Sequence, residues 1–109
     1  MPFPMPPGSF WAIIAKTEAE QSKPFPSDQY DSVAVAASNL AGSETVQLRV
    51  LVDDDINGPQ LKQVTDIYGT AINLTAAISA VALEGGPQYV AIKDETASPC
   101  SVVWYPKQK

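Results

Sequence analysis

Apolar and polar residues alternate most regularly between Thr45 and Val52. Every second residue is aliphatic and the residues between are polar, in the order Thr45, Val46, Gln47, Leu48, Arg49, Val50, Leu51, Val52, with Leu51 the exception. Successive side chains of a strand point to opposite faces of a sheet. The period of two therefore predicts a strand whose Val46, Leu48, Val50 and Val52 face a core while the other face meets water or a partner.

Further short apolar runs, separated by turn residues, also favour strands. Phe10–Ala15 has no polar alternation, which is typical of a strand buried on both faces or of an interface strand. The other predicted strands lie around Val33 and Val35 and at residues 61–67, 71–75, 88–93 and 100–105. We predict that Pro106 ends the last of them, because proline cannot donate to a strand ladder.

Residues 76–83 fit two interpretations. Leu74, Ile78 and Val81 have helical spacing and alanine favours helix, whereas Ile72, Leu74 and Ile78 also share one face of a strand. We favour an irregular strand.

Strands at such short spacing predict an all-β fold, an antiparallel β-sandwich of jelly-roll or immunoglobulin-like type with about seven or eight strands. The chain of 109 residues suits one domain. We expect residues 1–9 to form an extended N-terminal arm and residues 10–109 to form the single sandwich.

Proline divides the chain compositionally, since six of its ten prolines precede Ser27. In residues 1–8 they alternate with Phe3 and Met5, a composition that favours polyproline II geometry. This arm is either a tether across a neighbouring subunit or a frayed terminus. Residues 16–31 are polar and predict a long surface loop, with Phe25 between Pro24 and Pro26 pinning it.

Charge and hydropathy argue against nucleic acid and membrane as partners. Seven basic and twelve acidic residues give a net charge of −5, and no window concentrates Lys or Arg. The uncharged run 67–83 is interrupted by Gly69, Asn73 and other polar or small residues, which makes a membrane helix improbable. The start has no basic region before its apolar residues, so we expect synthesis in the cytosol.

The segment Asp53–Gly58 resembles the first half of a calcium-binding loop, with Asp53, Asp55 and Asn57 at the first, third and fifth positions. Position twelve, however, is Val64, where a glutamate should complete the coordination shell. Asn57-Gly58 equally supplies the positive φ angles of a hairpin turn. We favour the hairpin, with weak cation binding at residues 53–57 as the alternative.

No constellation for catalysis is visible. The sequence has no histidine, its carboxylates lie in polar segments, and Cys100 is the only cysteine. Cys100 lies in an apolar strand, where a buried, inert thiol is the common case. We therefore expect a protein that is not an enzyme and has no cofactor, metal or catalytic residue.

Several short segments together resemble small structural proteins of tailed-phage particles. They are Ala41-Gly-Ser-Glu-Thr-Val-Gln-Leu48, Tyr68-Gly-Thr-Ala-Ile-Asn-Leu-Thr75, Gly86-Pro-Gln-Tyr-Val-Ala-Ile-Lys93 and Cys100-Ser-Val-Val103, within about residues 39–105. The resemblance implies a decoration or cement protein on the capsid exterior, made in the host cytoplasm. Its partner would be the major capsid protein, with a homo-oligomer, dimer or trimer, at a capsid symmetry axis. The proline-rich start has no counterpart in the family's entry segment.

The low charge of the chain, 17% charged residues, suits a protein that binds other proteins. We expect the partner interface to include Phe3, Met5, Phe10, Trp11, Ile13 and Phe25. Two other functions stay open: a tail, neck or fibre component of the same particle, and a free carbohydrate- or peptide-binding sandwich that uses Trp104 and Tyr105.

Overall fold

A computed structural model describes residues 8–108. Phe3 and Met5 lie outside the described residues, as does most of the predicted arm. The described part of the chain is all-β, with ten strands and no helix.

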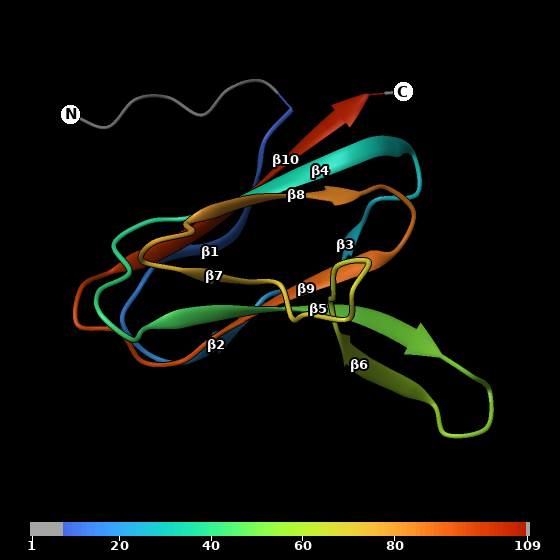
Figure 1. Ribbon diagram of the computed structural model, residues 1–109, viewed down its shortest axis with the longest axis horizontal. Coiled ribbons are helices and arrows are strands. Elements are labelled where there is room, and N and C mark those ends of the chain that lie inside the picture. Colours follow the sequence, from blue (N-terminus) through green and yellow to red (C-terminus); the bar gives the residue numbers. More distant parts are fainter. Residues whose placement is uncertain (1–7, 109) are drawn as a thin grey trace.

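The strands form two antiparallel sheets that pack as a sandwich (Figure 1). The four-stranded sheet has the order β1 (Phe10–Lys16), β10 (Cys100–Gln108), β4 (Tyr30–Ala37), β8 (Ala80–Glu84). The six-stranded sheet has the order β2 (Glu20–Gln21), β9 (Gln88–Lys93), β5 (Thr45–Asp53), β6 (Pro59–Gln63). Its two remaining strands extend the ladders of the central pair: β3 (Phe25–Pro26) pairs with β9, and β7 (Asn73–Thr75) pairs with β5. The all-β, antiparallel sandwich predicted from the sequence is thus confirmed.

The core lies between the sheets and follows the predicted alternation. Val46 and Leu48 of β5 are completely buried, whereas Thr45, Gln47 and Arg49 on the other face are not. The opposite sheet contributes the buried residues Val33, Val35, Val102 and Trp104. These positions of β4 and β10 also have a period of two, so the intervening residues of both strands point outward.

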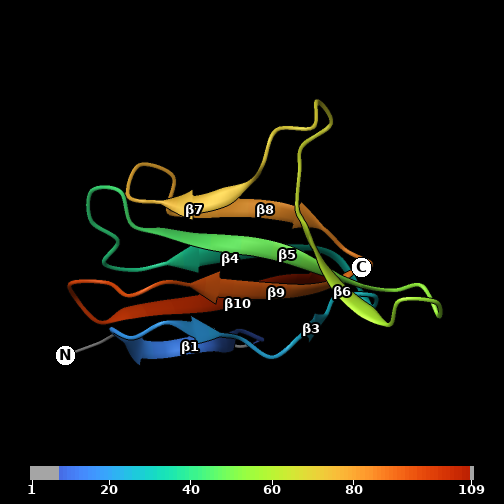
Figure 2. The ribbon, with the colours of Figure 1, turned by 90° about the horizontal axis from the view of Figure 1, so that it is seen from below.

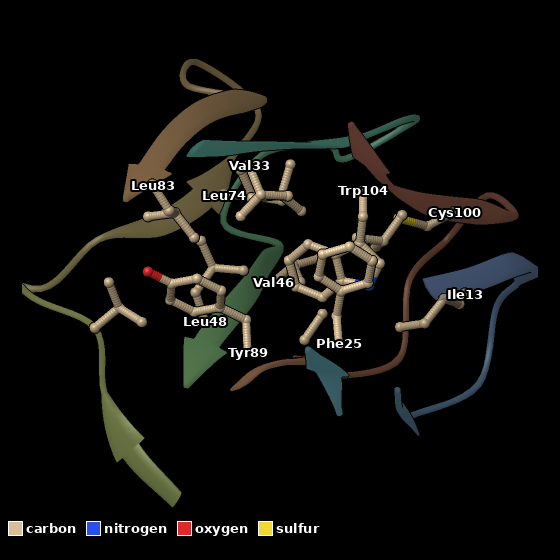
Figure 3. Packing of buried hydrophobic residues seen from close by; sticks show 14 residues of the cluster. Ile13, Phe25, Val33, Val46, Leu48, Leu74, Leu83, Tyr89, Cys100 and Trp104 are labelled. Atoms are coloured by element: carbon tan, nitrogen blue, oxygen red, sulfur yellow. The ribbon is translucent and has the colours of Figure 1, made fainter. Parts of the chain in front are cut away.

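Aromatic rings fill one end of this core. The ring of Phe25 stacks on that of Trp104 with 5.4 Å between their centroids, and Tyr89 lies beyond Trp104 at 6.4 Å (Figure 3). Phe25 therefore does pin its segment, as predicted, by inserting its ring between the sheets.

Two predictions about strand ends are wrong. Val52 is 41% exposed, because the β5–β6 hairpin extends beyond the body of the sandwich (Figure 1). Pro106 does not end β10, which continues to Gln108. At Pro106 the strand pairs with Val33 of β4, whereas its last pair with β1 is at Trp104. Proline is tolerated where a strand has a neighbour on one side only.

Residues 16–31 are not one long loop. They contain β2 and β3, which pair with β9, and the start of β4. Side chains replace part of the strand ladder here: Ser22 Oγ accepts a hydrogen bond from the Ala91 N–H at 2.9 Å. Ser27 is also buried, and its Oγ accepts from the Gly86 N–H at 3.0 Å.

The predicted strand at residues 61–67 begins at Pro59 and ends at Gln63, and that at 71–75 is confined to Asn73–Thr75. The ambiguous segment divides into a turn at residues 76–79 and β8. No part of it is helical, so the strand interpretation is confirmed for its second half.

The predicted turn at Glu84–Pro87 depends on a close backbone approach. A Cβ atom at Gly85 would lie 1.8 Å from the carbonyl oxygen of Tyr30. Only glycine fits there. The turn joins β8 to β9 and so carries the chain from one sheet to the other.

Candidate functional site

A groove runs along one edge of the sandwich, with residues of β1, β2 and β3 in its lining. At this edge the edge strand β1 of one sheet lies near β3 of the other (Figure 2). Its volume is about 480 Å³, within the usual range for binding clefts. The residues that line this edge groove are Phe10, Trp11, Ala12, residues 20–25 and Trp104. Aromatic side chains thus dominate one wall, while Gln21 and Lys23 supply exposed polar groups on the other.

The structure brings three of the predicted interface residues, Phe10, Trp11 and Phe25, together in the edge groove. Phe10 and Trp11 are 44% and 48% exposed, and the ring of Phe10 lies 5.5 Å from that of Phe25. Ile13 and Phe25 are themselves buried in the core. Phe10 and Trp11 are therefore available to a partner, whereas Ile13 and most of Phe25 support them from below.

A second surface, the outer face of the four-stranded sheet, is almost free of charge. Its side chains are assigned by register, because paired residues of neighbouring strands lie on the same side. One row across the strands is Trp11, Val103, Ala36 and Ala80, and the next is Tyr105, Ala34 and Ala82. Charge enters only at the third row, which consists of Lys107, Ser32 and Glu84.

Trp11 and Tyr105 rise above the alanines of this outer face. Together with Val103 and Ser101 they line a depression of about 280 Å³. Trp104 is only 2% exposed and faces the core, because it is adjacent to Tyr105 in β10. Trp104 and Tyr105 therefore do not form a common stacking surface for a sugar or peptide.

The loop between β6 and β7 presents two further apolar side chains that the sequence did not single out. Ile67 and Tyr68 are 91% and 86% exposed. Asp66 Oδ1 accepts hydrogen bonds from the Tyr68 and Thr70 N–H groups, at 2.8 and 3.0 Å. The tip projects from the body of the molecule (Figure 2).

The segment Asp53–Gly58, which resembles half of a calcium-binding loop, forms the tip of the β5–β6 hairpin. The carboxylate of Asp54 accepts hydrogen bonds from the N–H groups of Asn57 and Ile56, at 2.6 and 3.0 Å, and these bonds lower its pKa. The positive φ angles occur at Asp55 and Gly58, not at Asn57 as predicted. Within residues 8–108 no cluster of three or more His, Cys, Asp or Glu side chains could hold a metal.

Other polar side chains with tertiary partners link loops to strands. Glu44 accepts hydrogen bonds from the N–H groups of Ala41 and Ala97, both at 2.8 Å, which lower the pKa of its carboxyl group. Lys93 is buried, and its Nζ donates to the carbonyl oxygen of Glu18 at 2.7 Å. These contacts hold the end of the sandwich where β9 turns into β10.

Cys100 is buried, as predicted, and burial raises the pKa of its thiol. Since a raised pKa reduces the thiolate fraction, Cys100 contributes to packing in this structure rather than presenting a nucleophile.

In the part of the chain that the structure describes, no helix is available to cross a membrane. Comparisons with families of known proteins, with curated proteins and with solved structures found no match to this chain.

Proposed function

We propose that this chain is a non-enzymatic virion structural protein that binds the outer surface of a phage major capsid lattice and stabilises it. Two kinds of support exist. One is the resemblance of residues 39–105 to small tailed-phage structural proteins. The other, which carries the proposal, is the uncharged outer face made of Trp11, Val103, Tyr105 and four alanines.

Such a face suits contact with another folded protein. Interface cores lack charge and are enriched in aromatic residues, and Trp and Tyr often contribute most of the binding energy. The alanine side chains are short, so a partner can approach the backbone of β4 and β8 closely. Binding energy gained on an assembled lattice opposes dissociation of that lattice, which is how a cement protein stabilises a shell.

The proposed assembly is a dimer or trimer at a capsid symmetry axis, on the capsid exterior. The jelly-roll or immunoglobulin-like connection pattern is part of the same proposal. The edge groove and the outer face meet at Trp11, which lines both. In this proposal one copy contacts the lattice through the outer face and a neighbouring copy through the edge groove.

The test is co-sedimentation of the purified chain with shells of the major capsid protein encoded in the same genome, followed by cryo-electron microscopy. We expect one copy at each repeating lattice position, with the outer face toward the shell. Ala82→Glu should weaken binding by at least about tenfold, because it buries an unpaired charge in the contact.

Ala71→Glu is the matched control, since Ala71 is exposed in the loop that precedes β7 and lies away from the outer face. It adds the same charge and should bind as the unmodified chain does. Equal binding by the Ala82→Glu variant would contradict the proposal. A few copies at one vertex would instead assign the chain to the tail or neck.

A further inference from the structure

The edge groove is built from aromatic rings in a fixed arrangement. Phe25 stacks on Trp104 below, and Phe10 packs against Phe25 at the rim, with centroid distances of 5.4 and 5.5 Å. Phe25 and Trp104 are core residues, so close packing fixes the position of the groove floor. Aromatic-lined grooves are one of the recurring receptors for proline-rich segments.

This chain carries a segment of that chemistry in residues 1–7, Met-Pro-Phe-Pro-Met-Pro-Pro. Pro4 and Pro7 have the Pro-x-x-Pro spacing, and in polyproline II geometry residues three apart lie on the same face. Proline has no N–H, so such a segment offers carbonyl acceptors. Gln21 and Lys23 line the groove, and their exposed side chains can donate to these carbonyls.

We infer that the edge groove binds residues 1–7 of a second copy of the chain. The segment cannot easily reach its own groove. Phe10 and Trp11 form the groove wall, so the chain would have to reverse within Gly8 and Ser9. A second copy has no such constraint, and seven residues at about 3.1 Å each reach about 22 Å in polyproline II geometry.

The unpaired side of β1 does not compete for this role. The strand has register irregularities on both sides of Ile13, and Ala15 has a φ of 44°. Such irregularities protect an edge from pairing with another strand. The groove is therefore occupied through side-chain packing, and the contact is the exchange of proline-rich segments between copies.

This inference deepens the proposed function, because it names the contact that joins the copies of the oligomer. It is tested in solution without capsids. A negative result would leave binding of the lattice by the outer face intact, and the Ala82→Glu test above does not depend on it.

The experiment uses the full chain with Phe3→Ser and Met5→Ser, labelled with ¹⁵N, as the acceptor. Unlabelled unmodified chain is then added. We expect chemical-shift changes at the amides of Phe10, residues 20–23 and Phe25, with Ile67 and Tyr68 unaffected. Added unlabelled Phe3→Ser, Met5→Ser chain should cause no change, because it has lost the two large apolar side chains that flank the Pro4–Pro7 face and pack on the groove rim.

A second acceptor carries Pro24→Glu in addition to Phe3→Ser and Met5→Ser. This substitution places a carboxylate on the exposed rim of the edge groove, so this acceptor should bind the unmodified chain at least about tenfold more weakly. Sedimentation of the unmodified chain should show association that rises with concentration and disappears in the Phe3→Ser, Met5→Ser variant. Three results would overturn the inference: no shifts at millimolar protein, shifts confined to the outer face, or groove shifts that do not depend on concentration.

Discussion

Single residues in this fold are constrained most strictly at backbone crossings. Gly85 passes so close to Tyr30 that a Cβ atom would overlap the carbonyl oxygen, and its own N–H donates to the carbonyl of Asp31 at 3.1 Å. The neighbouring Gly86 donates to Ser27. Three strands, β4, β8 and β9, therefore converge on this one turn.

We predict that Gly85→Ala lowers the free energy of unfolding by about 3 kcal/mol, because backbone atoms cannot move aside as a flexible side chain can. Gly42→Ala is the matched control. Gly42 has a φ of +52° but open space around its Cα, so it should cost only about 1 kcal/mol of conformational strain. Urea unfolding followed by circular dichroism measures both, and equal losses would show that the close approach at Gly85 has no energetic weight.

At the scale of elements, the strands with a local signal were predictable. β5 has alternating aliphatic residues, and those within the sandwich are buried as predicted, while β10 contains the consecutive apolar residues Val102 to Tyr105. β2 and β3 have no such signal, because each has only two residues, Glu20–Gln21 and Phe25–Pro26, within a mostly polar segment. Their pairing with β9, about 70 residues away, depends on Ser22 and Ser27, whose side chains look like ordinary loop residues in the sequence.

Ser22 tests this explanation. Its N–H donates to the Ala91 carbonyl at 2.8 Å, and its Oγ accepts from the Ala91 N–H. Ser22→Ala leaves that buried N–H without an acceptor and should cost about 1 to 3 kcal/mol. Hydrogen exchange at the Ala91 amide should accelerate correspondingly. The exposed Ser43 provides the control, since Ser43→Ala should change stability by less than about 0.5 kcal/mol; unchanged exchange at Ala91 would contradict the explanation.

At the scale of the whole molecule, binding surfaces arise from the assembly of distant strands. The apolar character of Phe10 and Trp11 predicted contact with a partner, but the edge groove exists only because β1 pairs with β10 while β3 pairs with β9. The outer face was not predictable either. Alanine carries no strong strand signal, and only the register aligns Ala34 with Ala82 and Tyr105.

The same surface determines how binding should respond to salt. The two uncharged rows of the outer face leave only Lys107 and Glu84 near the contact, and these have opposite charges at the two sides of the third row. Attraction between charges is screened over about 10 Å at 0.1 M salt, whereas burial of apolar surface is not. We therefore predict that affinity for capsid shells changes by less than about threefold between about 0.05 and 0.5 M sodium chloride.

Lys107→Gln, which removes one of the two charges, should leave this salt response unchanged. Co-sedimentation across the salt series measures both, and a loss of more than about tenfold for the unmodified chain would mean that charged residues elsewhere, and not the outer face, make the contact.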